Sequence, residues 1–277
     1  MLNKLRHFLL LAFLLPALQS VAQAPYQRIV SLNGTVTEII CALGFEKSLA
    51  GVDVTSTYPA SVKALPKVGH NRNISAEPVL ALKPEIVITT SNYISPAVLE
   101  QIKAVGVKTV QLKQDYSLDG TRQLITEVAA ALNAPDKGAA LVKKLEQEQQ
   151  ALRINAGKKK VLFIYARGAG NMMVAGDGTS VTKMIQLAGA QNAITGFREY
   201  KPLNAESLIA ANPDVILMFD TGLESMGGVD GLLKVQGVAQ TNAGKNRKVI
   251  VMDGQYLTGF GPRVINAVKE LAVKING

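Results

Sequence analysis

Short runs of apolar, β-branched residues recur along the chain and alternate with segments whose apolar residues repeat at helical spacing. The runs that we predict as buried strands cover residues 28–32, 86–89, 107–112, 160–165, 215–219 and 249–253. The helical pattern covers residues 35–43, 96–105, 181–187 and 263–275. This alternation is typical of parallel sheets with helices on both faces. The sequence therefore predicts an α/β fold with parallel-rich sheets.

The middle of the chain, residues 118–154, has the pattern of one long helical stretch. Ala, Leu, Glu, Gln and Lys dominate it, and its apolar residues share a face. The segment Asn133-Ala-Pro135 interrupts this pattern and should kink the helix or restart it. The flanking segments, residues 25–117 and 155–277, are similar in size and alternation. We therefore predict two Rossmann-like lobes joined by one long α-helix, with a ligand cleft between the lobes.

The two predicted lobes also share an internal repeat. Residues 75–88 match residues 204–217, and residues 35–44 match residues 180–189. The first match aligns Glu77 with Glu206, Pro84 with Pro213, and Glu85 with Asp214. Each copy of this match predicts a capped short helix, a turn at the proline and the acidic residue, and then a buried strand.

The first 22 residues have the organisation of a secretory signal peptide. Lys4 and Arg6 precede an apolar segment that is too short to span a bilayer, and small residues follow it. We expect cleavage after Ala22. Cys41 lies well past this point, so we expect no lipid anchor at the cleavage site and a mature chain that is free in an exported compartment.

Composition excludes several kinds of site. The chain has one Cys and two His, and signal cleavage removes His7, which leaves His70 as the single histidine. These counts exclude a disulfide scaffold and a zinc site built from several His or Cys. A lone histidine and the absence of G-x-S-x-G also argue against an enzyme. The 30 Lys and Arg against 21 Asp and Glu suggest an anionic partner, but the lysines are too scattered to predict nucleic-acid binding.

Six phrases, in order along the chain, carry a resemblance to a known family. They are Arg28-Ile-Val-Ser-Leu-Asn-Gly-Thr-Val-Thr-Glu38, Gly51-Val-Asp-Val-Thr-Ser-Thr-Tyr-Pro59, Leu65-Pro-Lys-Val-Gly-His70, Met173-Val-Ala-Gly-Asp-Gly-Thr179, Thr241-Asn-Ala-Gly-Lys-Asn-Arg247 and Asp253-Gly-Gln-Tyr-Leu-Thr-Gly-Phe-Gly-Pro-Arg263. Together they resemble the substrate-binding proteins of ABC importers that have a single connecting helix and carry haem, cobalamin or ferric siderophores. The likeness is greatest to the periplasmic haem-binding proteins of bacterial haem uptake.

The resemblance implies a periplasmic protein, expected as a monomer, that captures haem between its lobes. It would hand the haem to the permease dimer of an ABC transporter at the inner membrane. Binding of cobalamin or of a ferric siderophore for the same type of importer stays open as the alternative.

The resemblance also points to the residues that would bind the haem iron. Relatives commonly place an iron-binding Tyr at the position of His70, and imidazole is an equally suitable axial ligand for haem iron. His70 is therefore the expected ligand. Tyr165 and Tyr58 are second choices, with Tyr165 ranked first because it ends a predicted strand. The remaining candidates are Met172, Met173 and Tyr256.

Haem propionates call for charge-assisted donors. Arg72 lies two residues beyond His70, so both side chains would point the same way in an extended loop. Arg263 begins the last predicted helix, where backbone N–H groups also favour an anion. Arg167 stands where relatives often have a His, and its guanidinium can pair with a propionate but cannot bind iron. Further candidates for contacts with the propionates or the porphyrin are Asn71, Asn73, Arg198, Tyr58, Tyr256 and Phe260.

Finally, the resemblance implies one acidic residue at the tip of each lobe that docks into basic pockets of the permease. Glu77 and Glu206 match those positions. A two-fold symmetric permease would need one equivalent carboxylate per lobe, which is what the repeat provides. The alternative is that both glutamates only stabilise a helix N-terminus.

Overall fold

The N-terminal lobe is built on a four-stranded parallel sheet. The computed structural model describes residues 26–70, 73–91, 93–155 and 157–277. The strand order is β2 (Leu49–Val52), β1 (Ile29–Ser31), β3 (Ile86–Thr90) and β4 (Lys108–Leu112). The helices of this lobe are α1 (Gly34–Ala42), α2 (Ala76–Ala81) and α3 (Pro96–Ala104), with short 3-10 turns at Glu46–Ser48 and Ala60–Ala64.

Both faces of this sheet are buried, as continuous apolar strands require. Ile29 and Ile86 pack in one cluster with α1, whereas Val30 and Val87 pack in another with residues of α2 and α3. Adjacent residues of one strand therefore bury against different helices, because successive side chains point to opposite faces.

The C-terminal lobe has a mixed sheet, which the sequence pattern predicted only in part. Its strand order is β10 (Val249–Met252), β9 (Val215–Phe219), β5 (Lys160–Ala166), β6 (Met172–Ala175) and β8 (Tyr200–Pro202), and β7 (Gln191–Asn192) pairs with β5. The strands β10, β9, β5 and β7 run parallel, while β6 and β8 join in antiparallel fashion. A tight turn at Gly168, whose φ is 77°, reverses the chain between β5 and β6.

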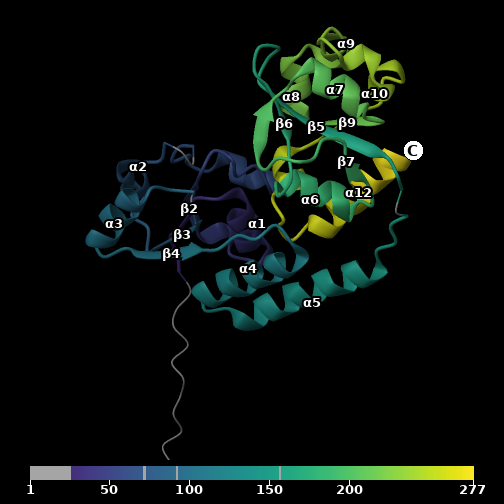
Figure 1. The fold of residues 1–277 in the computed structure, drawn as a ribbon. Helices are drawn as coiled ribbons and strands as arrows, with labels where there is room; N and C mark the ends of the chain where they lie inside the picture. The colour runs from purple at the N-terminus through teal and green to yellow at the C-terminus, as the bar shows by residue number, and fades with distance from the viewer. Residues whose placement is uncertain (1–25, 71–72, 92, 156) are drawn as a thin grey trace, which may run out of the picture.

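Helices cover both faces of the second sheet (Figure 1). They are α6 (Ser180–Leu187), α7 (Ala205–Ala211), α8 (Asp220–Ser225), α9 (Gly228–Leu233), α10 (Asn242–Lys245), α11 (Gly254–Thr258) and α12 (Val264–Asn276), with a 3-10 turn at Val238–Gln240. Figure 1 shows α7 to α10 on one side of the sheet and α6 and α12 on the other.

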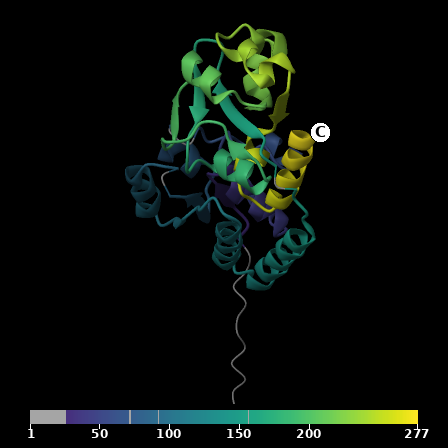
Figure 2. The same ribbon diagram turned by 45° about the vertical axis from the view of Figure 1, so that its right-hand side comes forward.

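The connection between the lobes is a helical hairpin in place of the single long helix that we expected. The chain ends α4 (Leu118–Ala131), turns at Asn133 with φ 56°, and restarts at Pro135 as α5 (Pro135–Ala151). The two helices lie side by side, since Arg122 Nη1 donates to Gln149 Oε1 at 2.8 Å. In Figures 1 and 2 this pair lies below the lobes. Proline therefore restarted the helix, which was one of its two predicted effects.

The repeat found in the sequence has a structural meaning. In the first lobe, the Glu85 carboxylate accepts hydrogen bonds from the backbone N–H groups of Gln27 at 2.6 Å and Arg28 at 3.2 Å. In the second, Asp214 accepts from the N–H of Lys160 at 2.9 Å. Each acidic residue thus holds the start of the neighbouring parallel strand.

The predicted signal peptide, residues 1–22, lies outside the described residues. Within the part of the chain that the structure describes, no helix combines the length and the apolar character needed to cross a membrane.

Candidate ligand-binding cleft

A cavity of about 1010 Å³ lies between the two lobes. Its size is typical of a site for a small organic ligand or cofactor. It is lined by Thr55, His70 and Asn73 from the first lobe, and by Tyr165, Arg167, Asn171, Met173, Ser180, Glu199, Tyr200, Phe219 and Thr258 from the second. A smaller cavity of about 330 Å³ continues it and shares Thr55, Ser180, Phe219 and Thr258 with it. Both lobes therefore contribute to one site.

His70 lies in a loop whose backbone is firmly held. The loop runs beside β2, since the N–H of Val68 donates to the carbonyl of Val52 and the N–H of Val54 donates to that of Gly69, both at 3.0 Å. The side chain of Val68 is buried, whereas His70 is exposed and lines the cleft. The neighbouring candidates Asn71 and Arg72 lie outside the described residues.

Tyr165 lies near the carboxyl end of β5, on the wall formed by the second lobe. Its half-buried ring packs edge-on against Phe219, with 6.0 Å between the ring centroids. The Arg167 guanidinium lies 5.5 Å from the Tyr165 ring centroid. Packing thus fixes the phenol, and a positive charge lies beside it.

Further phenols lie deeper between the lobes and are held neutral. Burial, together with the nearby Tyr116, Glu199 and Tyr165, raises the pKa of Tyr200 to about 12. Burial, followed by the charge of Asp53, also raises the pKa of Tyr93. Among the described residues that line the cleft, the acidic side chain is Glu199 and the basic side chains are His70 and Arg167.

Asp53 is a fully buried carboxylate beside Thr55 and Tyr93, which line the cleft. It accepts hydrogen bonds from the hydroxyl of Ser56 at 2.6 Å, from the N–H of Thr55 at 3.1 Å and from the hydroxyl of Tyr93 at 3.3 Å. The Thr55 hydroxyl also donates to it. These donors compensate the burial of the charge and orient Thr55, which lines the cleft.

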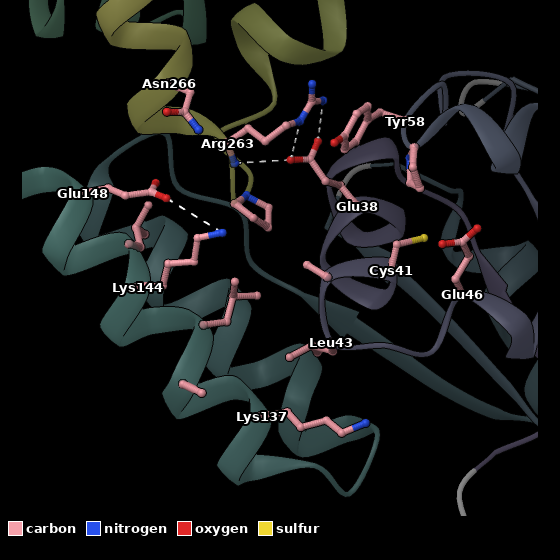
Figure 3. A pocket seen from close by; sticks show the side chains of 16 residues that line it. Glu38, Cys41, Leu43, Glu46, Tyr58, Lys137, Lys144, Glu148, Arg263 and Asn266 are labelled. Carbon is pink, nitrogen blue, oxygen red and sulfur yellow. Dashed lines mark hydrogen bonds and ion pairs between the residues drawn. The ribbon is translucent and has the colours of Figure 1, made fainter.

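Arg263 was predicted to bind propionate, but it does not line this cleft. Its Nε and Nη2 donate to the two carboxylate oxygens of Glu38 at 2.9 and 2.8 Å, and its guanidinium lies 3.4 Å from the Tyr58 ring centroid (Figure 3). Arg263 and Tyr58 line a separate cavity of about 610 Å³ between α1, α5 and α12. The guanidinium is thus already neutralised by a buried partner.

Two other predicted contacts also lie away from the cleft. Tyr256 packs beside Arg263, with its ring centroid 4.8 Å from the guanidinium. Phe260 is buried in the core, where its ring centroid lies 5.7 Å from that of Tyr116. Neither is among the residues that line the cleft.

The sequence pattern did not point to several of the residues that line the cleft. Phe219 could have been found, because it ends a predicted strand and ligands bind at the carboxyl ends of parallel strands. Tyr200 begins β8, which was not predicted, and Glu199 lies just before it, so neither residue carried such a signal.

Glu77 and Glu206 lie in the first turns of α2 and α7, one on each lobe. Both side chains are exposed, and neither lines the cleft. The repeat therefore places one exposed carboxylate at an equivalent position of each lobe.

The sequence pattern of a family described as periplasmic binding protein matches residues 29–256. Among solved structures, the apo form of the periplasmic heme-binding protein RhuT from Roseiflexus sp. RS-1 is 45% identical, with a TM-score of 0.87, covering 90% of this chain and 98% of its own. The periplasmic heme-binding protein BhuT, in complex with two hemes, is 38% identical, with a TM-score of 0.85 and coverage of 90% and 97%.

Other relatives extend the comparison. The heme binding protein HmuT is 30% identical, with a TM-score of 0.79 and coverage of 90% and 84%. Three single variants of it have also been solved, in which a histidine, a tyrosine or an arginine is replaced by alanine. The tyrosine and the arginine are two positions apart. The Vitamin B12-binding protein of Vibrio parahaemolyticus is 24% identical, covering 98% of this chain and 96% of that protein. The uncharacterized substrate-binding lipoprotein YvrC of Bacillus subtilis is 29% identical, with coverage of 90% and 80%.

Proposed function

The chain belongs to the periplasmic binding protein family, and from that premise we propose that it captures haem between its lobes and delivers it to an ABC importer. One observation carries the proposal. His70 from the first lobe and Tyr165 from the second line the same cavity of about 1010 Å³. Imidazole and phenol are both axial ligands for haem iron. The heme-binding relatives RhuT and BhuT, which match 90% of the chain, support the same ligand.

We propose His70 and Tyr165 as the axial ligands. A neutral imidazole binds iron without losing a proton, whereas a phenol must be deprotonated. The Arg167 guanidinium lies 5.5 Å from the Tyr165 ring centroid, so an iron-bound phenolate at this position would have a cation beside it. The same types of residue were replaced in HmuT, where the tyrosine and the arginine are also two positions apart.

The other cleft residues suit a flat, largely apolar ligand with acidic groups. Phe219, Met173 and the Tyr200 ring offer apolar contacts to a porphyrin face. Among the described residues that line the cleft, Arg167 is the cation that can pair with a propionate. Arg72 remains a further proposed partner, on the basis of its position two residues after His70.

Haem titration tests this function directly. Adding haemin to the purified mature protein should produce a saturable change in the Soret band at equimolar ligand. Cyanocobalamin and a ferric hydroxamate siderophore, titrated in parallel, test the alternative that the 24%-identical Vitamin B12-binding relative raises. No saturable Soret change, or tighter binding of either alternative ligand, would overturn the haem proposal.

Substitution of each ligand identifies its role. We expect His70→Ala and Tyr165→Phe each to shift the Soret band and to weaken haemin binding by about tenfold or more. Tyr58→Phe is the matched control, because Tyr58 lines the other cavity and is not among the residues that line the cleft. An unaltered spectrum in His70→Ala would exclude His70 as a ligand.

We further propose that the mature chain works as a monomer free in the periplasm, and that Glu77 and Glu206 dock it onto the permease dimer. Their exposure and their equivalent positions on the two lobes support this role. The relative YvrC is a lipoprotein, so cell fractionation with detergent partitioning is the appropriate check on anchoring. Recovery of the mature chain in the detergent phase would contradict a free protein.

A further inference from the structure

We propose that Glu38, Gln255 and Arg263 form a clasp that joins the lobes beneath the cleft and sets the spacing of its two walls. The clasp would thereby position His70 opposite Tyr165. The consequence for haem rests on the proposed function, whereas the consequence for lobe spacing does not.

The segment that carries two of these residues belongs to the second lobe. Asp253 follows β10 and caps the N-terminus of α11, because its carboxylate accepts a hydrogen bond from the N–H of Tyr256. Leu257 on α11 is fully buried, and α11 packs against α6 and α12. This segment should therefore move with the second lobe.

The side chain of Gln255 nevertheless binds the first lobe with its full hydrogen-bonding capacity. Its amide nitrogen donates to the carbonyl of Gly34 at 2.9 Å and to Glu38 at 3.3 Å. Its oxygen accepts from the N–H and the hydroxyl of Thr57, at 2.9 and 2.8 Å. A primary amide offers two donor hydrogens and two acceptor lone pairs, and all four are used here across the boundary between the lobes.

The ion pair between Glu38 and Arg263 is the second part of the clasp. Two parallel hydrogen bonds join the groups, and the Glu38 side chain is only 6% exposed. Figure 3 shows Arg263 reaching from the start of α12 toward Glu38 on α1, with Tyr58 beside it. Removal of either partner would leave an unpaired charge in a poorly hydrated site, which disfavours the arrangement in which the lobes contact each other here.

Backbone contacts continue the clasp along the same boundary. The carbonyl of Gly259 accepts from the Thr35 hydroxyl at 2.7 Å and from the Gln114 amide at 2.9 Å. A Cβ added at Gly259 would lie 3.1 Å from the Thr35 hydroxyl, and one added at Gly34 would lie 3.2 Å from the Cδ of Gln255. Glycine at these positions allows the two lobes to approach closely.

The clasp borders the cleft, because Gln255 itself lines the smaller cavity that continues it. Thr55, two residues before Thr57, and Thr258, just before Gly259, both line the cleft. On its other side, the cavity that Arg263 lines extends to α5, which is the second connection between the lobes. A small rotation at the clasp would therefore change the separation of the walls that carry His70 and Tyr165.

The test measures lobe spacing in the protein without ligand. Gln101→Cys on α3 and Gln240→Cys in the second lobe are exposed labelling sites, introduced together with Cys41→Ala and modified with spin labels. Pulsed electron paramagnetic resonance then gives the distance distribution between them. We expect Gln255→Leu, Glu38→Gln and Arg263→Gln to broaden this distribution toward longer distances.

Arg247→Gln is the matched control, because Arg247 pairs with Asp230 within the second lobe at 2.6 Å. It should leave the distribution unchanged. Thr57→Val removes only the hydrogen bond from the Thr57 hydroxyl to Gln255. It replaces Gln255→Leu in the distance measurement if that more disruptive variant fails to fold. A folded Gln255→Leu or Thr57→Val protein with the unaltered distribution would overturn the clasp.

Haemin binding provides the second readout. With wider walls, Glu38→Gln, whose side chain does not line the cleft, should weaken haemin binding by about tenfold and shift the Soret band toward that of a single-ligand variant, such as Tyr165→Phe. Unaltered binding and spectrum alongside a wider distribution would contradict the positioning role. If the unmutated protein binds no haemin, the proposed function fails, and the distance measurement still decides whether the clasp exists.

Discussion

At the scale of single residues, burial controls the chemistry of the lone thiol. Burial, together with the nearby carboxylates of Glu46 and Glu38, raises the pKa of Cys41 to about 12. Only the thiolate reacts with iodoacetamide, and at pH 8 this pKa leaves on the order of a thousandfold less thiolate than an ordinary thiol has. We expect alkylation of Cys41 in the folded protein to be slower by about that factor than in the guanidinium-unfolded chain. Equal rates in a mass-spectrometric time course would show that the thiol is not protected.

The sequence could predict which side chains line the cleft only where neighbouring residues determine the position of the side chain. His70 and Arg167 lie in loops at the cleft, and Tyr165 lies near the end of a predicted strand, so their positions follow from nearby sequence. The neighbourhood of Arg263 depends on Glu38, which is 225 residues away. The sequence did indicate that Glu38 would have a cationic partner, because Glu38 falls within an apolar helix and a buried charge needs a partner. The sequence did not say which cation that partner would be.

At the scale of elements, the repeated acidic residue after each proline turn holds two parallel strands together. Asp214 accepts from the N–H of Lys160 and from the Asn242 amide, at 2.9 and 3.1 Å. The first bond, opposed by burial and assisted by the second, holds the pKa of Asp214 below its ordinary value. A lowered pKa means that the folded protein binds this proton less well than the unfolded chain does. Its contribution to stability is therefore present above the unfolded pKa and is lost as the pH falls through the folded pKa.

We expect Asp214→Asn to lower the free energy of unfolding at pH 7 by about 1 kcal/mol, a value reduced for the partial exposure of the carboxylate. The difference from the unmutated protein should shrink below about pH 4. Urea titrations at pH 7 and below about pH 4 measure this difference in the free energy of unfolding, with Glu146→Gln at an exposed position as the control. A difference that stays constant with pH would contradict the role of the charge.

The helical hairpin depends on a close approach of α4 and α5. A Cβ at Gly138 would lie 2.5 Å from the Cβ of Ala129, so a larger side chain must push the helices apart. We expect Gly138→Leu to destabilise the protein by about 1–3 kcal/mol. Ala139→Leu, one residue further along and exposed, should leave stability nearly unchanged in the same thermal unfolding experiment. Equal melting temperatures of the two variants would argue against this packing.

Among the elements, the sequence identified those with long or strongly apolar patterns. The six strongest strand patterns correspond to β1, β3, β4, β5, β9 and β10. The short strands β2, β6, β7 and β8 were missed, because they lack the run of β-branched residues that marks the equally short β1 and β10. The interruption at Pro135 was recognised, but the reversal of α5 onto α4 depends on tertiary contacts such as that between Gly138 and Ala129.

At the scale of the whole molecule, two connections hold the lobes. One is the hairpin, in which α4 packs on α1 of the first lobe and α5 contacts α12 of the second. The other is the clasp of Glu38, Gln255 and Arg263, which lies between the hairpin and the cleft. Two connections on the same side of the cleft restrict large hinge opening and leave small rotations at the mouth. Release of a ligand would then require an external force on both lobes.

The exposed Glu77 and Glu206 offer one point of attachment per lobe for such a force. We expect the double variant Glu77→Lys, Glu206→Lys to abolish haem uptake by cells that carry the matching importer, because in the proposed docking each reversed charge would face a basic pocket. Haemin affinity and melting temperature should stay unchanged, since neither side chain lines the cleft. Glu100→Lys, on the exposed face of α3, controls for the change in net charge. Normal uptake by the double variant would exclude docking through these residues, and a loss of haemin affinity would place their role in the ligand site.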